Sequence, residues 1–200
     1  REVGGHVSAA GGIELALERA AAIGGNCVQV FSGSPRVWAR PDLAKFDPVK
    51  ITAKRKEKGI GSIITHSLYL VNLAADNPEL IRKSLAALAF DLQFDAHLQG
   101  QGVVVHLGSH KGAGWEAAKQ QVLTHLRQLV TTAPAGATFL IENAAGHNGK
   151  LGGDLTEIAW LISEVGAPNL GWCFDTCHAH AAGYGLGSSQ PATETRGGVK

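Results

Sequence analysis

The chain lacks most features that would set it apart from ordinary globular proteins. Its 200 residues include three cysteines and only 6% aromatic residues, and the formal net charge is +1. Three cysteines cannot all pair, which argues against a disulfide scaffold and favours a reducing, cytoplasmic location. The small charge argues against nucleic-acid binding over the whole surface, although a local basic patch stays open. No apolar run is long enough to cross a membrane, so we expect no membrane partner.

Methionine is absent altogether, although a complete translation product normally begins with it. Arg1 is a poor residue to follow a removed methionine, and the N-terminus has no signal-peptide core. We therefore expect these residues to be an excerpt of a longer chain. With 44% hydrophobic residues, the excerpt is large enough for one sizeable core.

Continuous apolar segments recur along the chain and predict parallel strands that are covered on both faces. They lie at residues 4–9, 26–33, 61–66, 102–108, 138–143 and 170–176. Helical patterns separate them, at residues 13–23, 47–58, 77–100, 114–132 and 154–166. Two helix starts are well marked, by Asn77 before Pro78 and by a capping box of Asp154 with Glu157.

This alternation of strand and helix predicts a parallel α/β fold. Two architectures fit the pattern, an open doubly wound sheet and a (β/α)₈ TIM-type barrel. A barrel usually takes ~250 residues, so the six strands would be about three-quarters of one. We expect a single domain over residues 1–185 and an irregular Gly/Ser/Thr-rich tail over residues 186–200.

Polar side chains follow four successive strands of the predicted sheet. These residues are His66, His106, Glu142, Asp175 and His178. A single histidine at a strand end is more often a hydrogen-bonded loop residue, but a buried carboxylate without a partner is costly. Because the carboxyl ends of parallel strands share one face, the five side chains would converge there. Imidazoles with carboxylates suit catalytic Zn²⁺ or Mn²⁺, and Glu142 could bridge two metals.

The segment 170–185 places two cysteines beside these candidates. On a continued strand, Cys173, Asp175 and Cys177 would share one side. A zinc ribbon needs two C-x₂-C pairs, whereas this segment has one C-x₃-C spacing. We therefore expect both cysteines to pack as small apolar residues. His180 is a weaker ligand candidate than Asp175 and His178, and could instead support the ligands from outside or lie in a loop.

Two loops carry residues that could contact a ligand. The loop 33–41 contains Arg36, Trp38 and Arg40, a combination that can grip a nucleic-acid backbone and stack on bases, or form a solvated loop with one packed Trp. The loop after the third strand contains Tyr69 and Asn72.

Six motifs together resemble the endonuclease IV family of metal-dependent apurinic/apyrimidinic endonucleases. They are GGHVSAAGG, RVW, HSLYLVNL, HLGSHKG, IENAAG and FDTCHAHAAGY, in family order from residue 4 to about residue 185. The resemblance implies a (β/α)₈ TIM-type barrel and cleavage of double-stranded DNA on the 5′ side of abasic sites during base excision repair. We also expect the protein to be a monomer.

The resemblance further implies a site with up to three zinc ions. His66, His106 and Glu142 would hold the first ion, Glu142 and Asp175 the second, and His178 the third. Glu142 would be the catalytic residue, and Arg36 and Tyr69 would enter the DNA groove at the lesion. HSLYLVNL departs from the more usual HDSYLINL at Ser67 and Leu68. The family's remaining ligands, a His, an Asp-x-His pair and a closing Glu, have no match after Tyr184.

Two other interpretations remain. A sugar isomerase or epimerase of the same barrel type would use the His, Glu and Asp residues on one divalent metal. Arg36, Trp38 and Tyr69 favour DNA over a small sugar. The second alternative is an inactive metal-binding fragment, because an incomplete barrel leaves two strand edges unpaired and lacks part of the ligand set.

Overall fold

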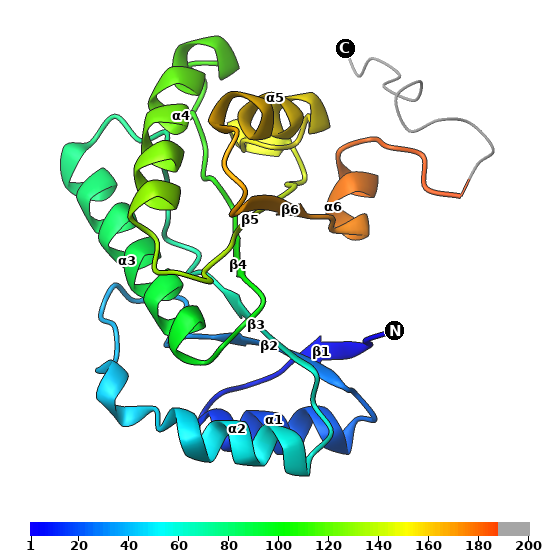
Figure 1. Ribbon diagram of the computed structural model, residues 1–200. Coiled ribbons are helices and arrows are strands. Elements are labelled where there is room, and N and C mark those ends of the chain that lie inside the picture. Colours follow the sequence, from blue (N-terminus) through cyan, green and yellow to red (C-terminus); the bar gives the residue numbers. More distant parts are fainter. Residues whose placement is uncertain (188–200) are drawn as a thin grey trace.

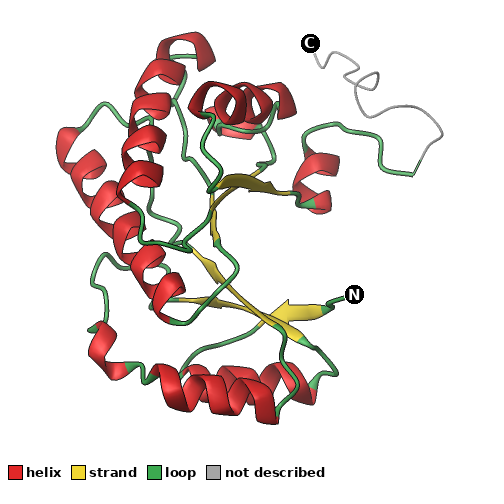
Figure 2. Ribbon diagram, in the orientation of Figure 1, coloured by secondary structure: helices red, strands yellow, loops and turns green. Residues whose placement is uncertain are grey.

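The structure is a computed structural model that describes residues 1–187, and it contains one parallel sheet (Figures 1 and 2). The strands are β1 (Gly4–His6), β2 (Cys27–Phe31), β3 (Ser62–His66), β4 (Val103–Val105), β5 (Phe139–Glu142) and β6 (Leu170–Cys173). Their order in the sheet is the order in the sequence. This progression confirms the barrel-type arrangement, because a doubly wound sheet reverses its strand order at a switch point.

A helix follows each strand, and the first five lie where the alternating pattern predicted helices. The helices are α1 (Ile13–Ala22), α2 (Pro48–Glu57), α3 (Pro78–His97), α4 (Trp115–Thr132), α5 (Leu155–Val165) and α6 (Thr176–Ala181). Two short 3₁₀ helices, η1 (Leu43–Lys45) and η2 (His147–Gly149), lie in loops. Helices α1 to α5 cover one side of the curved sheet and leave its other side open (Figure 1).

Two helices begin at the N-cap residues that the sequence predicted. Asn77 Oδ1 accepts from the backbone N–H groups of Glu79 and Leu80, at 2.9 and 3.2 Å. Asp154 Oδ1 accepts from Thr156 N at 3.0 Å. These caps satisfy backbone donors that have no partner inside the helix, so α3 and α5 begin within one residue of the expected positions.

The core lies between the sheet and its helices, in two groups of buried side chains. One contains Leu17 of α1 with Val30 and Ile63 of the sheet, and the other contains Leu88 of α3 and Leu126 of α4. Burying each such side chain contributes roughly 1.5–3 kcal/mol. The outer face of the sheet is therefore firmly packed against the helices.

The last strand differs from the prediction. We expected a strand over residues 170–176, but β6 ends at Cys173 and α6 begins at Thr176. Asp175 caps this helix, its Oδ1 accepting from His178 N at 2.7 Å, so the chain turns helical where the apolar pattern suggested extension. The prediction that Cys173, Asp175 and Cys177 share one side of a strand is therefore wrong. The prediction that Cys177 is packed is also wrong, because Cys177 is exposed.

The tail predicted for residues 186–200 falls mainly outside the described residues. Within residues 1–187, no helix is both long and apolar enough to span a membrane.

Candidate metal centre

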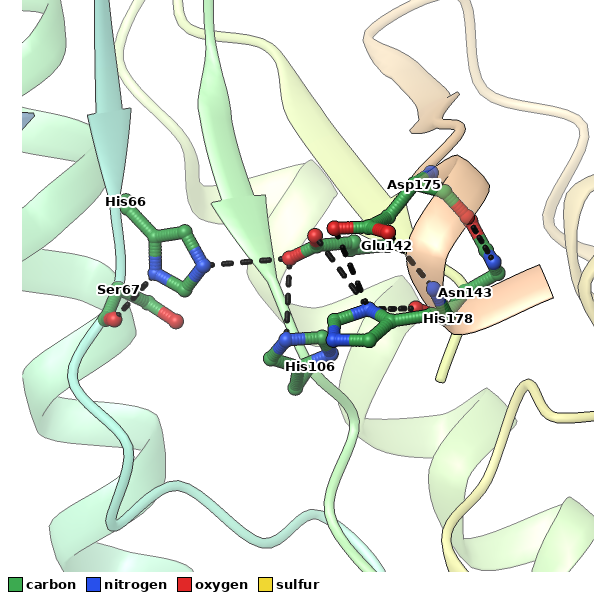
Figure 3. Close-up of polar contacts among 7 residues, drawn as sticks. All are labelled: His66, Ser67, His106, Glu142, Asn143, Asp175 and His178. Atoms are coloured by element: carbon green, nitrogen blue, oxygen red, sulfur yellow. Dashed lines mark hydrogen bonds and ion pairs between the residues drawn. The ribbon is translucent and has the colours of Figure 1, made fainter. Parts of the chain in front are cut away.

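The five side chains predicted to meet at the strand ends lie together on the open side of the sheet (Figure 3). Strand register explains part of this convergence. His66 pairs with Val104, Val104 with Leu140, and Glu142 with Cys173. Because side chains alternate along a strand, residues two positions apart project from the same face. His66, His106 and Glu142 therefore approach one another from three neighbouring strands.

Glu142 lies at the centre of the cluster. Its Oε2 is 3.1 Å from Nε2 of His66 and 3.1 Å from Nε2 of His106. Its Oε1 lies 3.7 Å from Nδ1 of His178. The side chain of Glu142 is only 9% exposed, so its carboxylate is largely withdrawn from water. One oxygen thus faces His66 at the end of β3 and His106 just after β4, while the other faces His178 of α6.

The hydrogen bonding of His66 indicates what belongs between it and Glu142. Nδ1 of His66 lies 2.7 Å from the carbonyl oxygen of Ser67, and a carbonyl can only accept, so Nδ1 carries the hydrogen. In the neutral ring, Nε2 then presents a lone pair toward the Glu142 carboxylate at 3.1 Å. Two lone-pair atoms at this distance repel unless a proton or a metal cation lies between them.

The environment of His106 favours the metal over the proton. Burial lowers the pKa of His106 to about 4, although the negative Glu142 opposes the shift. The ring is therefore neutral near pH 7 and can offer a lone pair. Two ligand atoms bound tetrahedrally to Zn²⁺ are about 3.3 Å apart, close to the two 3.1 Å distances from Glu142 Oε2. The three side chains therefore fit a metal ion with nitrogen and oxygen ligands.

A second group of potential ligands forms on the other side of Glu142. It consists of Glu142, Asp175 and His178, whose donor atoms lie within 4.8 Å of one another. Nδ1 of His178 is 2.9 Å from the carbonyl oxygen of Asn143, which favours a hydrogen on Nδ1 and leaves Nε2 to accept a metal. Nδ1 is also 3.6 Å from Asp175 Oδ2. Glu142 is common to both groups, a position suited to a bridging carboxylate.

Asn143 connects the end of β5 to the start of α6, and the second group lies at these two places. Its Oδ1 accepts from Asp175 N at 2.7 Å, and its Nδ2 donates to the Asp175 carbonyl at 2.9 Å. Its own carbonyl accepts from His178. Asn143 is 1% exposed. This residue therefore holds the start of α6 against β5 and orients both candidate ligands.

Replacing Asn143 with Ala should weaken Zn²⁺ binding about 10- to 100-fold, the cost typical of losing a group that orients metal ligands. Competition with a chromophoric chelator would measure the affinity. Asn169→Ala is the matched control, because Asn169 also bonds a backbone carbonyl, that of Val130, but precedes β6 at its other end. Equal zinc affinities for the two variants would contradict the assigned role.

Arg36 and Tyr69, the residues predicted to contact DNA, lie outside the cluster. Arg36 is exposed in the loop after β2. Tyr69 is 59% exposed, and its ring lies edge-on to His66 with centroids 5.9 Å apart. The Tyr69 N–H donates to the Pro35 carbonyl at 3.0 Å. The two loops are therefore joined beside the metal-ligand candidates.

The remaining histidines and cysteines do not join the two ligand groups. His110 accepts from the backbone N–H groups of Gly112 and Gly114 through Nδ1, which is a turn-forming role. His180 is exposed on α6. Burial, followed by the charge of Glu142, raises the pKa of the Cys173 thiol, which disfavours the thiolate that a metal requires.

Sequence reasoning missed two residues at this site. In the sequence Asn143 is only the neighbour of Glu142, and nothing there shows that its amide reaches Asp175. His6, at the end of β1, lies 4.4 Å from the ring of Phe31 and 5.8 Å from that of His66, centroid to centroid. Its position at the carboxyl end of the first strand was a usable signal, since the other candidates share it.

Sequence comparison relates most of the chain to known proteins. A family profile described as the xylose isomerase-like TIM barrel matches residues 17–199. The protein named Probable endonuclease 4 from Natronomonas pharaonis is 37% identical over 194 residues, which are 97% of this chain and 69% of the relative. The protein of the same name from Haloarcula marismortui is 36% identical over 193 residues, 96% of this chain and 69% of the relative.

Structural comparison agrees with the sequence matches. Endonuclease IV from Thermus thermophilus superposes with a TM-score of 0.74 at 39% identity, covering 90% of this chain and 64% of the other. A D-tagatose 3-epimerase-like protein reaches a TM-score of 0.68 at 17% identity, covering 88% of this chain and 66% of the other. The second likeness shows a shared fold alone. The present chain thus spans about two thirds of the length of these proteins.

Proposed function

Because this chain belongs to the endonuclease IV family, we propose that it is a metal-dependent hydrolase that cuts double-stranded DNA on the 5′ side of abasic sites in base excision repair. The observation that carries the proposal is the pair of ligand groups that share Glu142. Curated relatives named endonuclease 4 support it, at 36–37% identity over nearly the whole chain. The solved relative at 39% identity also bears the name endonuclease IV.

We assign the metal ligands by motif and by geometry. His66, His106 and Glu142 would hold one ion, Glu142 with Asp175 a second, and His178 a third. Zinc suits these nitrogen and oxygen donors, and Mn²⁺ is the alternative. When bound, such ions bind the scissile phosphate, lower the pKa of water and offset the charge that develops on the leaving oxygen.

Glu142 would orient the attacking water, because its two oxygens face both ligand groups. The water gives up a proton as its oxygen forms a bond to phosphorus, while the bond from phosphorus to the 3′ oxygen breaks in line. The leaving oxygen takes a proton and becomes a 3′-hydroxyl, and the abasic sugar keeps the phosphate as 5′-deoxyribose phosphate. Water is the only co-reactant that this reaction consumes.

Arg36 and Tyr69 would recognise the lesion. Both are exposed, and their loops are joined beside the site. An abasic nucleotide lacks a base to unstack, so turning it out of the duplex costs less than for an intact nucleotide. The Arg36 guanidinium and the Tyr69 ring would fill the gap in the duplex. Selectivity then comes from the deformability of the DNA rather than from reading bases.

Incision of a labelled duplex with one abasic site tests this function directly. We expect a single cut on the 5′ side that leaves a 3′-hydroxyl, and no cut in the same duplex without the lesion. A product formed by elimination on the 3′ side, or no cut at all, would refute the proposal. Gel mobility against synthetic marker strands identifies the ends.

Metal removal provides a second test. Dialysis against a chelator should abolish incision and lower the melting temperature by about 5–10 °C, since an ion present at ~100 times its Kd stabilises the fold by about 2.7 kcal/mol. Adding Zn²⁺ or Mn²⁺ should restore both properties, and elemental analysis counts the ions per chain. Full activity after complete metal loss would rule out this chemistry.

Sugar epimerisation is the less favoured activity. The epimerase-like neighbour is only 17% identical, and that likeness establishes the fold alone. Its test is conversion of ketoses in the presence of Mn²⁺. We further propose a cytoplasmic monomer: Cys27, Cys173 and Cys177 are all free thiols, consistent with a reducing compartment, and size-exclusion chromatography tests the oligomeric state.

A further inference from the structure

The loop that carries Arg36 has no regular secondary structure to fix its shape. It runs from the end of β2 to η1, and residues 32–42 contain neither helix nor strand. A free loop of this length would lose considerable conformational entropy on ordering, which weakens binding. If this loop contacts DNA, its conformation has to be set by side-chain contacts rather than by backbone hydrogen bonds of a helix or strand.

Arg40 supplies most of the side-chain contacts that set the conformation of this loop. Its guanidinium donates to the carbonyl oxygens of Ser34 at 3.0 Å, Val37 at 2.5 Å and Trp38 at 3.4 Å. It also donates to Ser32 Oγ at 3.2 Å. The bonded carbonyls lie on both sides of Arg36 in the sequence. Arg40 therefore folds the loop around itself and leaves Arg36 facing solvent.

Asp91 of α3 fixes the position of Arg40 through an ion pair. It is 0% exposed, its Oδ1 accepts from Ser32 Oγ at 2.5 Å, and it lies 3.8 Å from Arg40 Nη1. The Arg40 side chain is itself only 11% exposed. A buried carboxylate is costly unless it is paired, so Asp91 and Arg40 stabilise each other's position. The loop is thus tied to the long central helix.

We propose that Arg40, held by Asp91, is a positioning residue that shapes the loop so that Arg36 and Tyr69 present one surface to DNA. The hydrogen bond from Tyr69 N to the Pro35 carbonyl, 3.0 Å long, carries this order into the second loop. The inference rests on the proposed function. It deepens that function by naming two residues, Arg40 and Asp91, that lie outside the metal-ligand groups and shape the loop expected to contact DNA.

Arg40→Lys is the sharpest substitution, because it keeps the charge beside Asp91 but removes the fork that bonds three carbonyls. We expect KM for abasic duplex to rise roughly 10- to 100-fold, the scale of a small misplacement of binding groups, with kcat little changed. Hydrolysis of a small chromogenic phosphodiester, which needs only the metal centre, should stay at the wild-type rate. Parallel losses on both substrates would overturn the proposal.

Arg55→Lys is the matched control. Arg55 also donates to three carbonyls, those of Ile60, Gly61 and Gln99, but at the amino end of β3. This variant should keep the wild-type KM. Arg36→Ala should raise KM in the wild type and have a much smaller effect in the Arg40→Lys background. Additive effects of the two substitutions on log KM would show that Arg40 does not act through Arg36.

Limited trypsin digestion separates a failure of this inference from a failure of the proposed function. Arg40→Lys should speed cleavage after Arg36 about tenfold, because local opening exposes the peptide bond. Absence of incision by the wild type refutes the proposed function. Unchanged cleavage after Arg36 in the variant refutes the role of Arg40, whatever the wild type does to DNA.

Discussion

Glu142→Gln is expected to reduce incision of abasic duplex by at least ~10³-fold, within the range that a positioned acid or base contributes. The substitution keeps the size of the side chain and removes its negative charge. Glu142 Oε2 is the atom that lies 3.1 Å from both His66 and His106, and Oε1 faces His178. Loss of this one charge therefore weakens both ligand groups at once.

Steady-state incision and zinc content per chain together measure the effect. We expect the variant to lose more than one equivalent of metal, because the residue is common to both groups. Cys173→Ala is the matched control: Cys173 pairs with Glu142 in strand register, and we assign it no ligand role. A Glu142→Gln protein with normal zinc content and activity would show that the shared carboxylate is not a ligand.

Asp95→Asn should change the pH dependence of stability. Asp95 lies on α3, is 0% exposed, and accepts from Thr65 Oγ1 at 2.8 Å through Oδ1, while Oδ2 has no hydrogen-bond partner among the described residues. Burial raises the pKa of Asp95 from 3.8 to about 6, against the opposing effect of the Thr65 hydrogen bond. The folded state therefore binds this proton more tightly than the unfolded chain does.

The direction of the pH effect on stability follows from this difference in pKa between the folded and unfolded states. Below about pH 4 the group is protonated in both states, and the favourable contribution of the raised pKa is fully present. As the pH rises through 6, the folded protein ionises a buried carboxyl and loses on the order of 3 kcal/mol of stability. Asparagine cannot ionise, so the free energy of unfolding of the variant, relative to wild type, should rise by about this amount between pH 4 and pH 7.

Urea denaturation at a series of pH values measures this difference. The slope with pH is the diagnostic quantity, because the new amide adds an offset that does not depend on pH. Asp76→Asn makes the same change of charge at an exposed position and serves as the control. A flat difference curve for Asp95→Asn would mean that Asp95 has the same pKa in the folded and unfolded chains.

Much of the fold could be predicted from the sequence because its signals are local. Apolar runs such as residues 102–108 and 138–143 predicted β4 and β5, and Asn77 and Asp154 marked helix starts through caps formed within a few residues. The prediction was wrong after Cys173, where an apolar pattern continued but the Asp175 cap began α6. The pattern alone also left open the choice between an open sheet and a barrel-type order, which depends on pairing between distant strands.

The candidate site, like the fold, could be predicted from the sequence only in part. The sequence by itself determined which residues stand at the carboxyl ends of the strands, and parallel pairing then requires His66, His106, Glu142 and Asp175 to share one face. Only the tertiary structure decided which of them meet at which oxygen of Glu142, that Asn143 clamps Asp175, and that Asp91 of a distant helix holds Arg40. The physical reason is that strand ends follow from local hydrophobic periodicity, whereas these polar contacts form between side chains tens of residues apart, after the core has packed.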